Sequence, residues 1–384
     1  MKCRHGMKCR HGMNCGHDMK CRLGMTCGCG MKSDETHEIS NYRPISVLSV
    51  FSKILEKIVY TKLYSYLETN QIFYSKQFGF RKMCSTEYGI LELVNNLSLA
   101  MEQKQYTIGV FLDLSKAFDT VDHDILISKM SLCGVSEKGV KWFASYLTGR
   151  RQYVEVNNVV SEILPITCGV PQGSILGPLL FLLYVNDMAN AVPLLQVLMF
   201  ADDTSLFLSH ENINELFLTF NMQLRLIEKW FQSNRLSVNV NKTKFMVFGR
   251  EKEIDILPLQ LPTLTLGASN IKRCFFTKFL GVVIDESLTW SRQIRMIESK
   301  ISKNIGVIGM ARRHLSFPAA RSPYFAYIQP YISFGNIAWG STNKTKLQKI
   351  HKLQKKAVRI ISYATKTAHS RRLMKLHNML NNYE

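Results

Sequence analysis

Two adjacent carboxylates interrupt an otherwise apolar stretch in the middle of the chain. Residues 197–208 read VLMFADDTSLFL, so Asp202 and Asp203 separate two apolar runs, each of strand length. This pattern predicts a β-hairpin with the acids at or beside its turn. Adjacent carboxylates repel each other, and a divalent cation such as Mg²⁺, which prefers carboxylate oxygens, would remove that repulsion. For an isolated Asp-Asp pair, an ordinary polar hairpin turn is the alternative.

A third acid lies upstream, in residues 106–114, which read YTIGVFLDL. The segment is apolar and rich in strand-forming residues, with Asp113 near its C-terminal end. A carboxylate at the end of a buried strand is costly unless something pairs with it. If this strand lies beside the hairpin, the three carboxylates face one point. That arrangement predicts a two-metal site for in-line phosphoryl transfer.

Several further motifs occur in an order and at spacings that resemble those of reverse transcriptases. The residues of these motifs are most similar to those of the polymerases of jockey-like non-LTR retrotransposons. The resemblance covers roughly residue 40 to the end of the chain. The motifs are NYRPISVLSVFSKILEKIV (41–59), QFGFRKMCST (77–86), FLDLSKAFD (111–119), GVPQGSILGP (169–178), FADD (200–203), NKTK (241–244) and FLGV (279–282).

By this resemblance we expect an α+β fold, a right-hand polymerase with fingers, an antiparallel-sheet palm with helices, and a helical thumb. The implied activity is that of an RNA-directed DNA polymerase, a nucleotidyltransferase that adds deoxynucleotides to a primer 3′-OH. The implied cofactors are two Mg²⁺ ions, with Mn²⁺ as a substitute. The implied partners are an RNA template, a DNA primer and deoxynucleoside triphosphates. Catalysis and metal binding fall to Asp113, Asp202 and Asp203.

The resemblance also implies roles for residues outside the three acids. Arg81 would hold the triphosphate, which suits a guanidinium because it binds phosphate oxygens bidentately. Lys242 would lie near the leaving pyrophosphate, as a general acid or as a neutralising charge. Phe118 would be the steric gate against a 2′-OH, with a core phenylalanine as the alternative. The remaining implied contacts are Gln172 and Gly173 with the nucleotide and its paired base, and Phe279, Leu280 and Gly281 with the primer end.

The expected subdomains follow the same plan. Residues 39–105 would form fingers, 106–250 a palm with a finger insertion near 150–172, 251–289 a primer-grip region and 290–384 a basic helical thumb. Residues 41–70 open with Arg43-Pro44 and continue in an amphipathic helical pattern, with apolar residues at helical spacing from Ile54 to Leu67. Apolar periodicity also predicts helices over 87–101, 125–147 with breaks near Gly134 and Gly139, and 211–235. Residues 169–178 read as a loop entering a helix, with Pro171 at its start. There Gly173 and Gly177 would leave one helix face bare for a nucleotide, or for helix packing.

The charge of the chain favours a polyanionic partner. The formal net charge is +20 and the pI is near 9.5, which favours nucleic acid or an anionic membrane surface as a partner. The alternative is a soluble basic protein without such a partner. From Lys344 onward there are eleven Lys or Arg and one acid, which favours a helix lying along phosphates. The N-terminus has no apolar signal region and no apolar run is long enough to span a bilayer, so we expect an intracellular protein. We expect the nucleus to be its site of action, although the sequence carries no clear targeting signal.

Residues 1–34 differ in kind from the rest. Residues 1–31 repeat a six-residue Met/Cys/His-rich unit with almost no large apolar residues, which predicts a low-complexity tail without stable structure. A metal site is the alternative, although the six cysteines there form no C-x-x-C pair. The other four cysteines are expected to be small core or surface residues. They are Cys84, Cys133, Cys168 and Cys274.

Two alternatives to an active polymerase remain at the level of sequence. Elements of this kind usually encode an endonuclease and further finger sequence upstream, so the chain is expected to be a piece of such a reading frame. A catalytically inactive nucleic-acid-binding remnant is therefore the second hypothesis. The N-terminal repeat prompts a third, an unexpressed reading frame.

Overall fold

The structure, a computed structural model, describes residues 25–31, 42–153, 155–156, 159–258, 261–316, 319–377 and 379 of the 384-residue chain. The chain divides into two compact units. The described residues of the first unit fall within Met1–Phe73, Lys116–Asp187 and Asn234–Leu236. Those of the second fall within Tyr74–Ser115, Met188–Ser233 and Ser237–Glu384.

A five-stranded sheet is the centre of the second unit. Its strand order is β13-β10-β3-β9-β8, and every neighbouring pair is antiparallel except β13 with β10. The predicted hairpin and the predicted strand that carries Asp113 are therefore confirmed, and they lie side by side. The strands are β3 (Tyr106–Leu112), β8 (Gln196–Phe200), β9 (Asp203–His210), β10 (Lys244–Phe248) and β13 (Lys272–Arg273).

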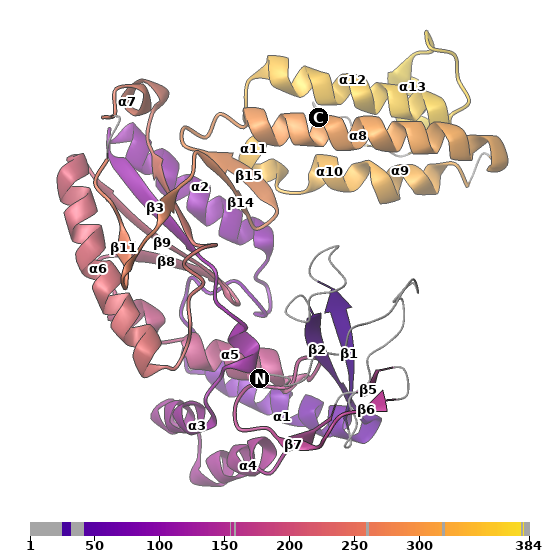
Figure 1. The fold of residues 1–384 in the computed structure, drawn as a ribbon. Helices are drawn as coiled ribbons and strands as arrows, with labels where there is room; N and C mark the ends of the chain where they lie inside the picture. Colours follow the sequence, from indigo (N-terminus) through magenta and orange to yellow (C-terminus); the bar gives the residue numbers. More distant parts are fainter. Residues whose placement is uncertain are drawn as a thin grey trace. The chain divides into compact units, whose positions relative to one another are not determined.

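Two helices cover opposite faces of this sheet, as strand alternation requires when both faces are apolar. On one face the sheet residues Leu198, Phe207, Met246 and Phe248 share a core with Ile90, Leu93 and Leu97 of α2 (Thr86–Glu102). On the other face the rings of Phe245 and of Phe217 in α6 (Ile213–Ser233) meet edge to face, 5.9 Å apart. Figure 1 shows α2 and α6 flanking the strands. The mixed sheet-and-helix class is therefore confirmed.

The rest of the second unit is a small hairpin followed by helices, which confirms the helical character predicted from Trp290 onward. The long helices α8 and α12 pack on each other through buried isoleucines and Val358. The helices are α7 (Glu251–Asp255), α8 (Ser291–Ala311), α9 (Arg321–Tyr327), α10 (Gln329–Ser333), α11 (Asn336–Trp339), α12 (Lys344–Ile361) and α13 (Ser370–Leu376), with 3₁₀ turns at Met188–Ala191 and Arg312–His314. The short strands are β11 (Thr265–Leu266), β12 (Ser269–Asn270), β14 (Phe276–Phe279) and β15 (Val282–Asp285).

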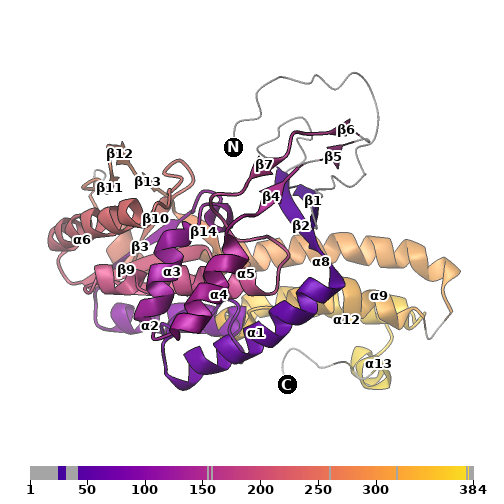
Figure 2. The ribbon, with the colours of Figure 1, turned by 90° about the horizontal axis from the view of Figure 1, so that it is seen from below.

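The first unit is mainly helical. Helix α5 is apolar throughout and all its residues but Pro178 are buried, and it contacts both α1 and α3 (Figure 2). The helices are α1 (Val50–Thr69), α3 (His123–Leu132), α4 (Glu137–Leu147) and α5 (Leu176–Val185), with a 3₁₀ turn at Ala117–Asp119. The strands are β1 (Met25–Met31), β2 (Tyr42–Leu48), β4 (Arg151–Gln152), β5 (Glu155–Val156), β6 (Val159–Val160) and β7 (Leu164–Pro165).

The N-terminal predictions need correction. Met25–Met31, expected to lack stable structure, forms β1, which pairs antiparallel with β2 over seven residues. Backbone groups alone make such a ladder, so it needs no large side chains. The helical pattern predicted within 41–70 is confirmed as α1, which begins at Val50, whereas the strand β2 that precedes it was not predicted. Repeat residues 1–24, and with them most of the tail and its metal-site alternative, lie outside the described residues.

Two further predictions about helices were wrong in detail. In α1, the side chains of Ile54, Leu55 and Ile58 are more than half exposed although they fit the predicted apolar stripe, whereas the carboxylate residue Glu56 is buried. The break between α3 and α4 lies at Gly134, where φ is +78°, but Gly139 lies inside α4. Among the described residues, no helix is long and apolar enough to cross a lipid bilayer.

Candidate active site

The acid doublet lies at the tip of the β8–β9 hairpin. The last paired residues are Phe200 and Asp203, so Ala201 and Asp202 form a two-residue turn. Ala201 has a φ of +58°, and its side chain is 5% exposed. A positive φ at the first turn position fits a type II′ turn, where glycine is preferred. A left-handed alanine costs about 1–2 kcal/mol, so the backbone next to Asp202 is strained.

Asp113 lies one step beyond the last paired residues of β3 and β9. Leu112 is opposite Thr204, so the next position on each strand carries Asp113 and Asp203. Leu112 and Leu114 are buried on one face, which places Asp113 on the other. Asp203 alternates with buried Thr204 in the same way, so both acids belong to one face. Opposite positions on one face have Cβ atoms roughly 4.5–5.5 Å apart.

A turn between α6 and β10 holds the backbone of Asp113. The carbonyl of Asp113 accepts from the Asn239 N–H at 2.8 Å, and its own N–H donates to the Thr243 hydroxyl at 3.3 Å. Thr243 is fully buried, and its hydroxyl also donates to the carbonyl of Asn239. Lys242 is exposed beside it in the same turn. The sequence pattern drew attention to Lys242 but not to Asn239 or Thr243, which carry the contacts.

The carboxylates suit a hard divalent cation in their chemistry. Asp113 and Asp202 are half-buried, and neither carboxylate has a hydrogen-bond or ion-pair partner among the described residues. Carboxylate oxygens are the ligands that Mg²⁺ prefers, and partial exposure leaves room for water and phosphate. Over those same residues, however, no group of three or more His, Cys, Asp or Glu side chains is already arranged to hold a metal ion. The carboxylates of these acids thus fit Mg²⁺ in their chemistry, but the described residues are not arranged as a metal site. The assignment of Asp113, Asp202 and Asp203 as metal ligands stays a prediction.

The loop that carries Arg81 is attached to the edge strand β8. Phe78 N–H donates to the Met199 carbonyl at 2.8 Å, and Met199 N–H donates to the Lys76 carbonyl at 3.0 Å. Arg81 is half-buried, and its Nη1 donates to the carbonyl of Tyr74 at 3.1 Å. Its guanidinium is thus oriented from within its own loop.

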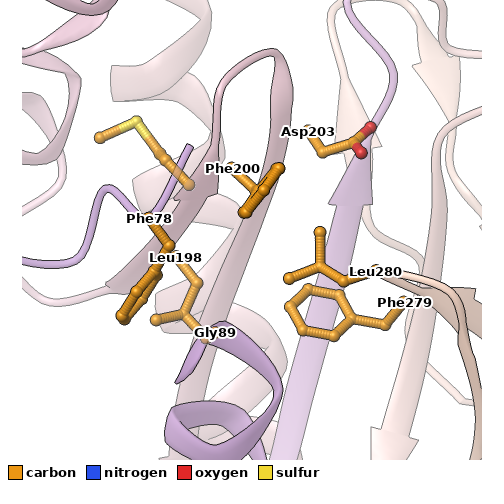
Figure 3. A pocket seen from close by; sticks show the side chains of 8 residues that line it. Phe78, Gly89, Leu198, Phe200, Asp203, Phe279 and Leu280 are labelled. Carbon is orange, nitrogen blue, oxygen red and sulfur yellow. The ribbon is translucent and has the colours of Figure 1, made fainter. Parts of the chain in front are cut away.

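A small hollow adjoins the hairpin tip (Figure 3). The β14–β15 turn reaches it through Phe279 and Leu280, and the positive φ values of Leu280 and Gly281 fit a type I′ hairpin turn. Figure 3 shows the carboxylate of Asp203 directed away from the apolar side chains around it. The predicted primer-grip region therefore contains a hairpin at these residues, and its contact with a primer stays a prediction. The lining residues are Phe78, Gly89, Leu198, Met199, Phe200, Asp203, Phe279 and Leu280.

Phe118 and Gln172, predicted to contact the nucleotide, both lie in the first unit. The ring of the half-buried Phe118 stacks on that of Phe181, with centroids 4.4 Å apart. Gln172 is oriented by its Nε2, which donates to Asp119 Oδ1 at 2.7 Å, and by its carbonyl, which accepts from Ser46 N–H. Their roles toward a nucleotide stay predictions.

The predicted bare helix face is wrong for residues 171–177. Helix α5 begins only at Leu176, so Pro171 and Gly173 lie in the turn before it. Gly173 is exposed and has a φ of +98°, which is why that position requires glycine. A Cβ on Gly177 would lie 2.7 Å from Ser174 Oγ and 2.9 Å from the carbonyl of Pro171, so that glycine permits close packing of the turn on the helix.

A buried carboxylate that sequence reasoning missed holds this turn. Glu56 is 2% exposed; its Oε2 accepts from Ile175 N–H and its Oε1 from the Tyr146 hydroxyl, each at 2.7 Å. Burial, and then the hydrogen bond with Glu56, raise the pKa of Tyr146. Tyr146 in turn lies beneath the Arg150 guanidinium, 4.6 Å from ring centroid to Cζ.

Comparison with known proteins identifies the family. Residues 31–284 match the family model described as reverse transcriptase (RNA-dependent DNA polymerase). The chain belongs to this reverse transcriptase family. The predicted resemblance is confirmed over most of the chain, and a right-hand polymerase is the fold that membership implies.

Curated relatives of this reverse transcriptase chain include polymerases of mobile elements in Drosophila melanogaster. The RNA-directed DNA polymerase from mobile element jockey is 29% identical over 338 residues, which cover 85% of this chain and 36% of the relative. The probable RNA-directed DNA polymerase from transposon BS is 30% identical over 343 residues, 86% of this chain and 37% of the relative. The chain thus spans little more than a third of the length of these relatives.

Solved structures similar to this reverse transcriptase chain include two yeast telomerases in complex with a TWJ fragment of telomeric RNA. The one from Candida tropicalis has a TM-score of 0.44 at 12% identity and covers 87% of this chain and 59% of that chain. The one from Candida albicans has a TM-score of 0.47 at 9% identity and covers 89% and 64%, respectively.

Proposed function

We propose that this chain is an RNA-directed DNA polymerase of a jockey-like non-LTR retrotransposon. The reaction is transfer of a deoxynucleotide to a primer 3′-OH, directed by an RNA template. One observation carries the proposal: β3 pairs with β9 so that Asp113 and Asp203 occupy adjacent cross-strand positions on one face, with Asp202 in the turn between β8 and β9. This pairing lies inside the segment that matches the reverse transcriptase family.

Asp113, Asp202 and Asp203 would hold two Mg²⁺ ions. Bound there, the metal ions supply the charge that lowers the pKa of the primer 3′-OH and offsets charge on the leaving pyrophosphate. The protein contributes fixed carboxylates: the turn at Asn239 and Thr243 holds the backbone of Asp113, and the hairpin holds the doublet. The partial exposure of these acids keeps room for the phosphates of a substrate.

Further side chains would bind and orient the nucleotide and the primer. Arg81 supplies a permanent positive charge for the triphosphate, and Lys242 neutralises or protonates the pyrophosphate. Phe118 excludes a 2′-OH, while Gln172 and Gly173 contact the nucleotide and its paired base. The β14–β15 turn, with Phe279, Leu280 and Gly281, supports the primer end.

The basic helix α12 would contact nucleic acid. One face of it is buried through Ile350, Ala357 and Ile361, which leaves most of its lysines on the remaining faces. A cationic helix of this kind favours phosphate binding that weakens as salt rises. RNA template and DNA primer are therefore the proposed partners. Separately, we propose that the protein is intracellular and that the nucleus is its site of action.

Primer extension on an RNA template with Mg²⁺ tests the proposal. The parent chain is compared with Asp202→Asn and with Asp255→Asn, which removes an exposed carboxylate in α7. We expect Asp202→Asn to lower the rate at least about 100-fold, because a lost metal ligand removes several kcal/mol of transition-state stabilisation. Asp255→Asn should extend like the parent.

Two other outcomes would contradict the proposal. Equal activity of the parent and Asp202→Asn would remove the assignment of the acids. Salt-dependent RNA binding by the parent without any extension would favour the inactive nucleic-acid-binding remnant instead.

A further inference from the structure

Gln77 is a buried polar residue at the start of the QFGFRKMCST motif, and the proposed chemistry assigns it no role. Its side chain is 2% exposed, although it lies in a loop. The loop runs parallel to the end of β8, where Gln77 forms a bridge with Met199. The flanking backbone bonds between this loop and Met199 fasten it to the sheet edge. Gln77 is therefore held at a fixed place beside the hairpin that carries the acid doublet.

The side-chain oxygen of Gln77 joins the loop to the hairpin tip. Gln77 Oε1 accepts from the N–H of Gly79 at 2.8 Å and from the N–H of Ala201 at 3.0 Å. Both partners are N–H donors, so the oxygen and not the amide nitrogen must face them. Ala201 is the left-handed first residue of the turn, and Asp202 follows it directly. The bond thus fixes the peptide plane that precedes the acids.

Gly79 makes this contact sterically close. A Cβ on Gly79 would lie 2.2 Å from the nitrogen of Ala201 and 2.8 Å from the carbonyl carbon of Phe200. Both neighbours are backbone atoms, so no side-chain rotation could relieve the clash. Glycine is thus the one residue that lets the loop backbone reach the turn, which the Gln77 oxygen then bonds.

The other end of the Gln77 amide is less satisfied. Its Nε2 is buried and has no hydrogen-bond partner among the described residues. A buried N–H donor without a hydrogen-bond partner lowers the stability of the fold. The burial of Gln77 is therefore not accounted for by hydrogen bonds that satisfy both ends of its amide. What the amide provides is an acceptor aimed at the turn.

We propose that Gln77 is a positioning residue that holds the Ala201–Asp202 turn in its left-handed geometry and so orients the two acids for cation binding. The inference rests on the proposed function for its catalytic consequence. Its structural part, the restraint on the turn, stands independently of activity.

The variant that tests this is Gln77→Met, which keeps the length and burial of the side chain and removes the acceptor. Gln293→Met is the matched control, because Gln293 is also 2% exposed and its Oε1 accepts one backbone N–H, from Val283 at 2.9 Å. Both variants lose one buried amide from the second unit. Only Gln77→Met loses a bond to the hairpin tip.

Three readouts are compared. Exchange of the Ala201 amide hydrogen should be at least about 10-fold faster in Gln77→Met and unchanged in Gln293→Met, since loss of a buried bond exposes the amide. Mn²⁺ binding, followed by the EPR signal of the free ion, should weaken about 10-fold in Gln77→Met alone. In primer extension, Gln77→Met should lower kcat about 10-fold with KM for the nucleotide within about twofold, as expected for lost orientation.

The outcomes separate the two proposals. A parent chain that does not extend a primer contradicts the proposed function, while amide exchange and Mn²⁺ binding still decide the role of Gln77. A folded Gln77→Met that matches Gln293→Met in all three readouts overturns the positioning role. If Gln77→Met does not fold, the parent decides: an Ala201 amide that exchanges as fast as an unstructured peptide overturns the inference, and protection of about 100-fold or more supports it.

Discussion

The buried carboxylate of Glu56 should control the order of the turn that carries Gln172 and Gly173. Its two oxygens accept from Ile175 N–H and from the Tyr146 hydroxyl, each at 2.7 Å. Replacing it by methionine keeps a side chain of similar length and removes both acceptors. The Ile175 N–H then loses its partner at the last residue before α5.

The size of the effect follows from the one bond that Ile175 loses. A hydrogen bond to a charged group contributes about 1.5–3 kcal/mol net, and each 1.4 kcal/mol is a factor of ten. Exchange of the Ile175 amide should therefore be about 10- to 150-fold faster in Glu56→Met than in the parent. Glu56→Gln keeps one neutral acceptor oxygen, so its effect should be smaller, about threefold to tenfold.

Native-state hydrogen exchange resolved at single amides is the assay. Glu68→Met is the matched control, because Glu68 lies on the same helix with an exposed side chain. It should leave Ile175 exchange within about twofold of the parent, since removal of an exposed charge has little effect on a buried bond. If folded Glu56→Met exchanges Ile175 within threefold of the parent, the bond does not hold the turn and the reasoning fails.

Two further predictions concern the second unit. Burial raises the pKa of the Cys274 thiol to about 11, so at pH 8 its thiolate fraction and alkylation rate should be about 100-fold below those of the same thiol in denaturant. As pH rises, the alkylation rate of the folded chain should increase about tenfold per pH unit until about pH 11. Mass spectrometry of modified peptides measures these rates, and equal native and denatured rates would contradict the prediction. Phe217→Ala should lower the free energy of unfolding of this unit by about 3–5 kcal/mol in a urea titration, because Phe217 is 1% exposed. Leu218→Ala, one residue on and 65% exposed, should change it by no more than about 0.5 kcal/mol, and similar losses in both variants would contradict the packing described.

The central sheet could be predicted from the sequence because its signals are local. The apolar runs around the Asp202–Asp203 doublet and before Asp113 are each short enough to read directly, and the structure places them as neighbouring strands. The apolar stripe of α6 is equally local, since residues three and four apart share a helix face. In both cases the period of the side chains already decides which face is buried.

The N-terminal half of α1 shows where such local reasoning ends. Its apolar periodicity continues through Ile54, Leu55 and Ile58, yet these side chains are more than half exposed. Periodicity tells which residues share a face, but not whether another element covers that face. The strand β2 was missed for a related reason: its partner β1 comes from a low-complexity segment with no strand-like side-chain pattern.

The supporting contacts of the candidate site could not be predicted, because they join residues far apart in the chain. Gln77 bonds Ala201 across 124 positions, and Glu56 bonds Ile175 across 119. Amide and carboxylate side chains are usually exposed, so each residue alone predicts a solvated surface. Only the folded structure shows that both side chains are buried. It also shows that each accepts a hydrogen bond from a backbone N–H of a turn that carries candidate site residues. The acids thus follow from composition and spacing, whereas the precision of their geometry depends on long-range acceptors that a local pattern cannot reveal.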